Sequence, residues 1–503
     1  MLPILQRFDA LAVADDRGVI AAPGSVLVER LPAGSLVPAD TPTGSQPWRF
    51  RVLAVGTPDQ VGSHPLAGGS GRFESAALAT SVLLPGFVNA HTHLDLTHIG
   101  PLPFDPDAGF VGWIDAIRRA RRSDAPGIAA SVAMGTDLSI RAGVVAVADI
   151  AGAPRGRSSL VPAVALARSG LSGLSLLEFF AIGRGLGAFQ TWLPELIAEG
   201  RRLGLTSEPP FEPRSDRTTV VGSVRVGLQP HAPNTVDARA YRWAAGVSAA
   251  LQMPLATHLA ETRDERRFVG EADGPQREFL QSLNLWDDSI LTELGPAAQV
   301  DPRERHPINH TLRALQGHPS PLLVHVNDLG PGESREEQAA RAERLDRLSN
   351  SGGTVVYCPR ASSYFRAHET LGPHAYREML DAGVPVALGT DSVVNLPPVR
   401  SGAGAQSLPV LSTFDEARFL FRRDGTRPET LLAMATTLGA RALGFEPGAF
   451  RFERGAPLAG LNAVDLRGVP GDGDDGSILA RALRIESPVR VLLHSARAEG
   501  VGA

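Results

Sequence analysis

The chain contains no lysine, and all 49 of its basic residues are arginine. The absence of lysine excludes Schiff-base chemistry, covalent attachment of pyridoxal phosphate, a Walker-type phosphate-binding lysine and a carbamylated lysine that bridges two metal ions. Cys358 is the single cysteine, which excludes an intramolecular disulfide and any zinc or iron–sulfur site built from several cysteines. These absences narrow the chemistry before any motif is considered.

The chain also lacks a strong charge bias and a long apolar segment. Its 49 basic and 54 acidic residues give a formal charge of −5, so nucleic acid and anionic membranes are not expected partners. No apolar run approaches the roughly 18 residues of a membrane span, and the first residues have neither the basic nor the apolar segment of a secretory signal. We therefore expect a cytoplasmic protein.

The 503 residues divide into three regions by their sequence pattern. Short β-prone segments at 1–84 give way to apolar runs that alternate with segments of helical period over 85–449, and β-prone segments return at 450–503. This alternation predicts an α/β fold with a (β/α)8 TIM-like barrel at 85–449, carried on a small composite β-sandwich domain formed by both chain ends.

Helices and long loops can be placed within this framework. Two stretches rich in Pro, Gly and Ser, 204–219 and 395–409, are predicted to be long loops, the second lying over the mouth of a pocket as a lid. The predicted helices include 112–122, 128–142, 237–252, 334–350, 374–382 and 426–443.

Side chains that bind metals or move protons stand where the apolar strand segments end. Because the loops at the carboxyl ends of barrel strands converge, we expect these side chains to meet in one site. In chain order they are His91, His93, Asp149, Glu178, His231, His258, Glu261, His325, Arg360 and Asp391.

His91 and His93 stand two residues apart, so on a strand they point to the same side and can share one cation. Such a pair alone is a weak metal signal. His258, His325 and Asp391 end three later strand segments, and imidazole with carboxylate is a ligand set suited to zinc or ferrous iron. The combination predicts a metal site.

Several motifs resemble those of one enzyme family. The segments PGFVNAHTHLD, GLQPHAPNTV, THLAE, LLVH, CPR and ALGTDS, in this order, resemble the amidohydrolase superfamily over about residues 81–445, in its branch of cytosine-deaminase-like aminohydrolases and chlorohydrolases. The segment HLAETRDERRFVGEADGPQREFLQSLNLWD is similar to a stretch of bacterial members related to aminodeoxyfutalosine deaminase.

The resemblance implies one divalent metal ion, zinc in preference to iron, held by His91, His93, His258 and Asp391. It also implies that His325 contacts the metal's water or the substrate, that Glu261 shuttles protons and that Asp391 accepts the water's proton. His231, Glu178 and Arg360 are expected to bind a small-molecule substrate. The expected assembly is a homodimer, and the absence of lysine independently favours a mononuclear site.

These features predict a metal-dependent hydrolase that deaminates an amino-substituted N-heterocycle or a nucleoside-like compound. An aminodeoxyfutalosine-type substrate fits the resemblance, although those relatives carry histidines where this chain has Ser362 and Ala367. Two alternatives stay open. The same site could hydrolyse a ring chloride or a cyclic amide, and a non-catalytic scaffold could keep the barrel for assembly, against which the retained ligands argue.

Other conspicuous residues have structural interpretations. The arginines of the run 118–122 are predicted to form a solvated helix face. His306 and His310 stand in a proline loop and are expected at the surface, whereas Cys358 is expected to be a small buried hydrophobe. Three further carboxylates are expected to support neighbouring groups or cap elements: Asp95, Asp149 and Asp328.

Overall fold

The computed structural model of the chain describes residues 4–31, 48–67, 72–205, 224–400, 406–468 and 477–495. Nearly all of the predicted loop 204–219, and residues 401–405 of the predicted lid 395–409, lie outside the described residues. On either side of the second gap, the short strands β14 (Val399–Arg400) and β15 (Gln406–Ser407) pair antiparallel. Within the described part of the chain, no helix is both long enough and apolar enough to cross a membrane.

Two parallel four-stranded sheets form the centre of the molecule. The first contains β6 (Phe87–Thr92), β7 (Val144–Ala151), β8 (Ser172–Phe179) and β9 (Val224–Pro230). The second contains β10 (Ala256–Leu259), β11 (Leu322–His325), β12 (Thr354–Tyr357) and β13 (Val386–Leu388). Single parallel bridges, Leu228 to Leu255 and Thr92 to Asp391, join the sheets at both seams, so the eight strands run as one ring.

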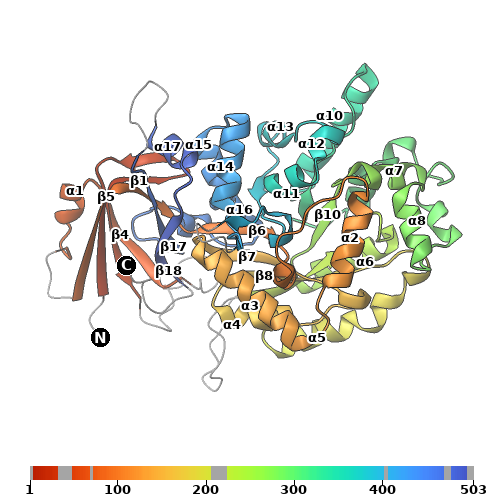
Figure 1. The fold of residues 1–503 in the computed structure, drawn as a ribbon, viewed down its shortest axis with the longest axis horizontal. Helices are drawn as coiled ribbons and strands as arrows, with labels where there is room; N and C mark the ends of the chain where they lie inside the picture. Colours follow the sequence, from red (N-terminus) through yellow and green to blue (C-terminus); the bar gives the residue numbers. More distant parts are fainter. Residues whose placement is uncertain are drawn as a thin grey trace.

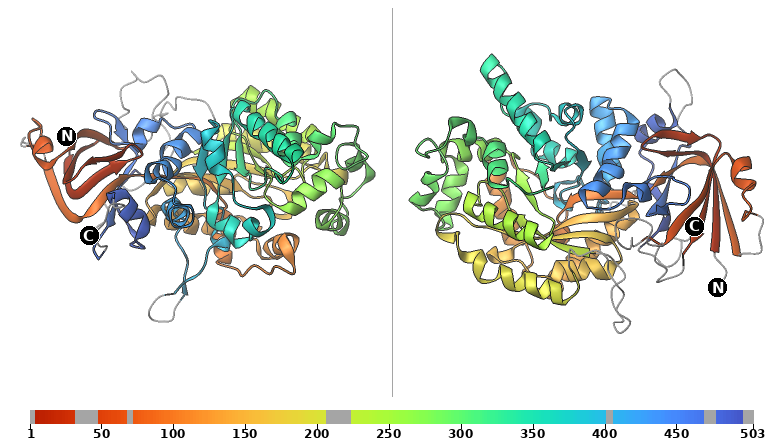
Figure 2. Two further views of the ribbon diagram at one scale, coloured as in Figure 1. Left: turned by 90° about the horizontal axis from the view of Figure 1, so that it is seen from above. Right: turned by 180° about the vertical axis from the view of Figure 1, so that it is seen from behind.

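The strands are buried on both faces because alternate residues pack inward and outward. Val88, Ala148 and Val324 pack in a cluster of mostly small side chains inside the ring. Phe87 and Val147 belong to the larger cluster between the strands and the helices. Figures 1 and 2 show this helical layer surrounding the strands. The chain is therefore an α/β protein with the layered arrangement that the alternating sequence pattern predicts.

The six predicted helices are present, with ends that differ from the prediction by no more than three residues. They are α2 (Gly109–Ala120), α3 (Ala125–Arg141), α6 (Ala238–Leu251), α10 (Arg335–Asn350), α13 (Tyr376–Asp381) and the pair α15 (Pro428–Ala435) and α16 (Thr437–Ala442). The predicted helix 426–443 is split because Thr436 has a non-helical backbone. Other barrel helices are α4 (Val161–Ser169), α5 (Leu193–Arg202), α7 (Arg263–Glu271), α8 (Pro275–Ser282), α9 (Pro307–Ala314) and α14 (Thr413–Asp424).

Strands from both ends of the chain join one eight-stranded sheet beside the barrel (Figure 1). They are β1 (Ile4–Asp15), β2 (Gly18–Ala21), β3 (Gly24–Arg30), β4 (Phe50–Gly56), β5 (Arg72–Pro85), β16 (Pro457–Leu458), β17 (Gly460–Asp465) and β18 (Val489–His494). The hydrogen bonds link these strands into a single sheet. The division of that sheet into a sandwich, and the domain boundaries at 84 and 449, stay predictions.

Buried polar groups fasten this sheet to the barrel. Asn462 on β17 donates its amide to the carbonyls of Pro85 and Gly143, at 3.0 and 3.2 Å. Asp16, which is almost fully buried, accepts hydrogen bonds from the Thr437 hydroxyl and the Arg451 guanidinium, each at 2.6 Å. These contacts join segments more than 300 residues apart in the chain.

Replacing Asp16 by alanine should lower the stability of the protein, because it leaves the partly buried Arg451 guanidinium and the Thr437 hydroxyl without their acceptor. The expected loss is about 2 kcal/mol, seen as a lower urea midpoint of unfolding. Asp9→Ala is the matched control, since Asp9 pairs with Arg7 at the surface of the same sheet and should change the midpoint little. Equal midpoints for the two variants would contradict the prediction.

Candidate active site

Most of the predicted site residues line one cavity of about 790 Å³ at the carboxyl ends of the barrel strands. His93 follows β6 directly, Glu178 stands near the end of β8, and His258 lies on β10. The other predicted residues that line this cavity are His231, Glu261, His325 and Asp391. This is the end of a parallel barrel at which the loops converge, so residues from six strands meet over a short distance.

Four histidines and one aspartate form a cluster, and all of them except His91 line the cavity. Ligand atoms of His91, His93 and His258 all lie within 4.8 Å of one another, as do those of His91, His325 and Asp391. Asp391 Oδ1 is 3.5 Å from His91 Nε2 and 3.6 Å from His93 Nε2. The imidazoles therefore converge on one side of a single carboxylate.

The protonation of this cluster suits a metal ion. Burial, with a smaller contribution from His91, lowers the pKa of His93 to about 4, and burial likewise holds the pKa of His258 well below its usual value. His258 donates Nδ1–H to the His231 carbonyl at 3.1 Å, which leaves Nε2 as its ligand atom. His91 Nε2 is buried and has no hydrogen-bond partner among the residues that the structure describes.

Asp391 supplies the negative charge of the cluster. Burial opposes its ionisation, but the neighbouring imidazoles of His91, His93 and His325 keep its pKa below the ordinary value. Neutral imidazole nitrogens around an ionised carboxylate form the nitrogen and oxygen donor set that zinc accepts. The residues present therefore fit one divalent ion.

Two of these residues have backbone conformations that are rare outside glycine. His325 has φ of 71° and Asp391 has φ of 60°, in the left-handed region. Side chains from other segments hold both in place: His374 donates from Nε2 to the His325 carbonyl at 2.9 Å, and the Asn395 amide donates to Asp391 Oδ2. The strained backbone turns both side chains into the site, and no motif in the sequence predicted either supporting contact.

Glu261 follows β10, and its carboxyl group lies beside His325, with Oε1 3.5 Å from His325 Nε2. Burial, with the nearby Asp391 charge as a smaller cause, raises the pKa of Glu261 well above its usual value. The backbone here is fixed by Glu265, which accepts from the amides of Ala260 and Glu261 at 2.7 and 2.8 Å. The raised pKa suits Glu261 to the donation of a proton.

One wall of the cavity carries His231 and Glu178. His231 Nδ1 is 2.7 Å from the Thr235 hydroxyl, and burial lowers the pKa of the imidazole. Ligand-type atoms of Glu178, His231 and His258 all lie within 4.8 Å of one another, so this wall stands next to the histidine cluster. A substrate at the cluster would touch both side chains.

The rest of the cavity is mostly apolar. Helices α2 and α8 supply much of its lining, together with residues after β8 and after α8. The larger apolar side chains of the lining include Leu96, Phe110, Trp113, Ile114, Ile117, Phe180, Ile182, Phe279, Leu280, Leu283 and Leu285. Four arginines also line the cavity: Arg118, Arg119, Arg121 and Arg155. The volume and this lining suit a substrate that extends well beyond one heterocyclic ring.

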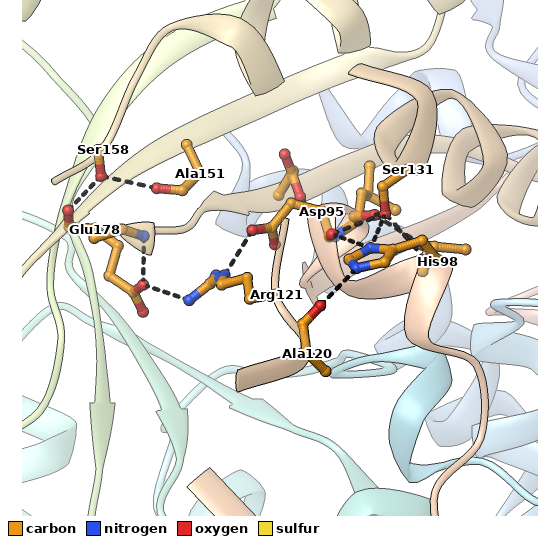
Figure 3. Close-up of polar contacts among 12 residues, drawn as sticks. Asp95, His98, Ala120, Arg121, Ser131, Ala151, Ser158 and Glu178 are labelled. Carbon is orange, nitrogen blue, oxygen red and sulfur yellow. Dashed lines mark hydrogen bonds and ion pairs between the residues drawn. The ribbon is translucent and has the colours of Figure 1, made fainter. Parts of the chain in front are cut away.

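The prediction of a solvated arginine face is wrong for Arg121. Arg118 and Arg119 are exposed, but Arg121 is turned inward, with its side chain only 13% exposed. Helix α2 ends at Ala120, and Asp124 caps the next helix, so Arg121 lies in the turn between them. Its guanidinium pairs with two buried carboxylates (Figure 3). The Asp-Ala-Pro start of α3 was the one sequence signal that a helix ended before this arginine.

Two histidines expected at the surface are buried, and an arginine expected to bind the substrate lies outside the cavity lining. The surface prediction for His306 and His310 is wrong, because both are buried, and His306 accepts the Ile308 amide at the start of α9. Arg360 is not brought into the cavity: its guanidinium bonds to Glu416 at 2.6 Å, and it is absent from the lining. Cys358 is buried, as predicted.

Comparisons with known proteins agree with this geometry. The model of the amidohydrolase family matches residues 82–470. An aminodeoxyfutalosine deaminase from Deinococcus radiodurans is 30% identical over 403 residues, which cover 78% of this chain and 79% of that protein. A 5-methylthioadenosine/S-adenosylhomocysteine deaminase from Haloarcula marismortui is 26% identical over 398 residues, which cover 76% of this chain and 73% of that protein. The solved structure of Helicobacter pylori aminofutalosine deaminase superposes with a TM-score of 0.65 at 18% identity, covering 97% of this chain and 98% of that one.

We expect the purified protein to hold one zinc ion per chain, measured by inductively coupled plasma mass spectrometry after dialysis against zinc. His93→Ala should lose most of this metal, because it removes one of the converging imidazole nitrogens. His368→Ala is the control, since His368 is an exposed histidine that does not line the cavity. Equal zinc contents in the two variants would contradict this assignment.

Proposed function

Because the chain belongs to the amidohydrolase family and is a hydrolase of carbon–nitrogen bonds, we propose that it deaminates a nucleoside-like N-heterocycle. The observation that carries this proposal is the placement of Glu261, whose pKa is raised, in the same cavity as Asp391, whose pKa is lowered, with Glu261 Oε1 3.5 Å from His325 of the histidine cluster. Hydrolytic deamination needs both a proton donor and a proton acceptor within reach of one carbon atom.

The proposed reaction converts a ring C–NH₂ group and water into a ring carbonyl and ammonia. His91, His93, His258 and Asp391 would hold one divalent ion, for which we propose zinc. Bound there, the ion would acidify a water molecule and so supply a nucleophile near neutral pH.

The chain's own residues supply the proton transfers. Asp391 accepts the proton of the attacking water, because it is the ionised carboxylate of the cluster. Glu261 donates its proton to the ring nitrogen next to the carbon under attack. As the ring carbonyl forms, Glu261 takes the remaining hydroxyl proton of the added water and passes it to the departing amine, and the proton held by Asp391 then restores Glu261. His325, 3.5 Å from Glu261, donates a hydrogen bond toward the oxygen that develops negative charge.

The walls bind the rest of the substrate. His231 and Glu178 form hydrogen bonds to the heterocycle or its sugar, and the apolar lining accommodates a further substituent. An aminodeoxyfutalosine-type substrate fits such a cavity. Ser362 and Ala367, the positions where the chain departs from relatives of that type, are buried and absent from the lining, so the departure does not argue against this substrate. A homodimer and a cytoplasmic location stay predictions.

The proposal is tested by measuring ammonia release from a panel of compounds by the zinc-loaded protein. The panel comprises cytosine, guanine, adenosine, S-adenosylhomocysteine, methylthioadenosine and aminodeoxyfutalosine. We expect release from a nucleoside of the panel, reduced roughly 10²- to 10⁴-fold in Glu261→Gln, which keeps the shape but cannot donate a carboxyl proton. Release of chloride or ring opening without ammonia, from chlorinated heterocycles or cyclic amides, would replace deamination by the alternative leaving groups.

The pH dependence follows from the raised pKa of Glu261. A group that must be protonated is active below its pKa, so kcat/KM should fall as the pH rises through that value. The measurement is a kcat/KM profile from pH 5 to pH 10 with the substrate found above, alongside a profile of zinc content. A rate that rises continuously to alkaline pH at constant zinc content would exclude Glu261 as the acid.

A further inference from the structure

Arg121 connects two buried carboxylates at the edge of the cavity (Figure 3). Its Nε donates to Asp95 Oδ2 at 2.9 Å, and its Nη1 donates to Glu178 Oε2 at 3.4 Å. Asp95 lies in the 3-10 helix Leu94–Ile99, which begins directly after His93, and Glu178 lies on β8. One guanidinium thus links the segment after the metal motif to the cavity wall.

The surrounding backbone leaves room for this guanidinium. A Cβ atom on Gly152 would stand 1.5 Å from Arg121 Nη2 and 2.3 Å from its central carbon, so any side chain there would displace the arginine. His98 fixes the approach of the arginine from the other side. Its ring contacts the Asp95 carbonyl and the carbonyl of Ala120, the residue before Arg121, each at 3.1 Å.

Glu178 is held by one of its two carboxylate oxygens. Oε2 accepts the Ala153 amide at 3.0 Å and the Arg121 guanidinium, and the Ser158 hydroxyl donates to the Glu178 carbonyl (Figure 3). Within the described part of the chain, Oε1 accepts no hydrogen bond, and the residue lines the cavity. Oε1 of this buried carboxylate is therefore a hydrogen-bond acceptor without a donor, and a bound molecule can supply that donor.

We propose that Arg121 is a positioning residue for specificity: it fixes Glu178 so that Oε1 accepts a hydrogen bond from a hydroxyl or N–H donor of the substrate. This inference rests on the proposed deamination of a nucleoside-like compound. It makes a donor at that position a requirement for tight binding, because an analogue without it leaves a buried carboxylate unpaired. The role is separate from the chemical step, which Glu261 and Asp391 carry out.

A purely structural ion pair and a positioning role predict different kinetics. Loss of structure lowers the amount of active enzyme, whereas loss of positioning weakens binding of substrates that have the donor. The substrate donor has two sources, a sugar hydroxyl or a base N–H, and deoxynucleosides distinguish them. The readouts are therefore KM and kcat separately, measured with matched substrates.

The experiment measures ammonia release from the panel nucleoside that the wild-type enzyme deaminates, and from its 2′-deoxy and 3′-deoxy forms. Arg121→Gln should raise KM roughly 10- to 100-fold, as expected for a lost hydrogen bond to a charged group, while kcat changes much less. The double variant with Glu178→Gln should be no worse than Glu178→Gln alone. Arg122→Gln, an exposed neighbour, should match the wild type.

The deoxynucleosides identify the donor. If it is a hydroxyl, one deoxy form should show the raised KM already in the wild type and no further rise in Arg121→Gln. If it is an N–H, both deoxy forms should respond to the substitution as the parent nucleoside does. Either pattern supports the inference.

Three results would overturn the inference: an unchanged KM in Arg121→Gln, a fall in kcat alone, or additive losses in the double variant. If Arg121→Gln does not fold, Gly152→Ala makes the same comparison, because the added methyl group occupies the place of the Arg121 guanidinium while the arginine stays in the chain. An unchanged KM in Gly152→Ala would also overturn the inference. A wild type that deaminates no panel compound would reject the proposed function together with this inference, whereas an active wild type with an insensitive Arg121 would reject the inference alone.

Discussion

Closure of the strand ring between its first and last members is the interaction on which the site depends. Asn89 on β6 exchanges two hydrogen bonds with Thr390, at 2.7 and 3.1 Å, and the His93 amide donates to the Asp391 carbonyl at 2.6 Å. These contacts join segments about 300 residues apart. Because these contacts lie beside the ligands in the chain, the same bonds that complete the ring set the spacing between the two histidines at the end of β6 and the carboxylate after β13. The fold and the metal cluster are therefore one structure.

The pKa values of the site residues follow from how deeply the closed ring of strands buries them. Burial keeps His93, His258 and His325 neutral, and it would also neutralise Asp391 if the imidazoles did not surround it. At Glu261 the nearby Asp391 charge adds to the effect of burial, and both raise the pKa of the carboxyl group. The pKa values of two carboxyl groups in one cavity are thus shifted in opposite directions because of their neighbours. This difference suits Asp391 to accept a proton and Glu261 to donate one.

The sequence predicted what depends on local pattern and strand order. The alternation of apolar runs with helical segments predicted the α/β fold, and the polar residues at strand ends included the histidines and carboxylates that the structure brings together. The family assignment and the class of enzyme are confirmed by the comparisons. The supporting contacts could not be predicted, because Arg121 to Glu178 and His374 to His325 join residues 57 and 49 positions apart with no spacing rule. Arg360 shows the converse error: its place beside a strand end suggested a site role, but a buried carboxylate from α14 binds it.

Helix α2 lines the cavity although it is buried at only one residue, Ile117. Phe110, Trp113 and Ile114 face the cavity. The helix is held at its end by hydrogen bonds of Ala120 and Arg121. Substitutions along this helix can change the shape and polarity of the entrance while leaving the ring closure and the histidine cluster intact. Part of the selectivity is thus encoded in a segment of the chain that carries none of the metal-site residues, so this helix can change the substrate preference while the reaction stays the same.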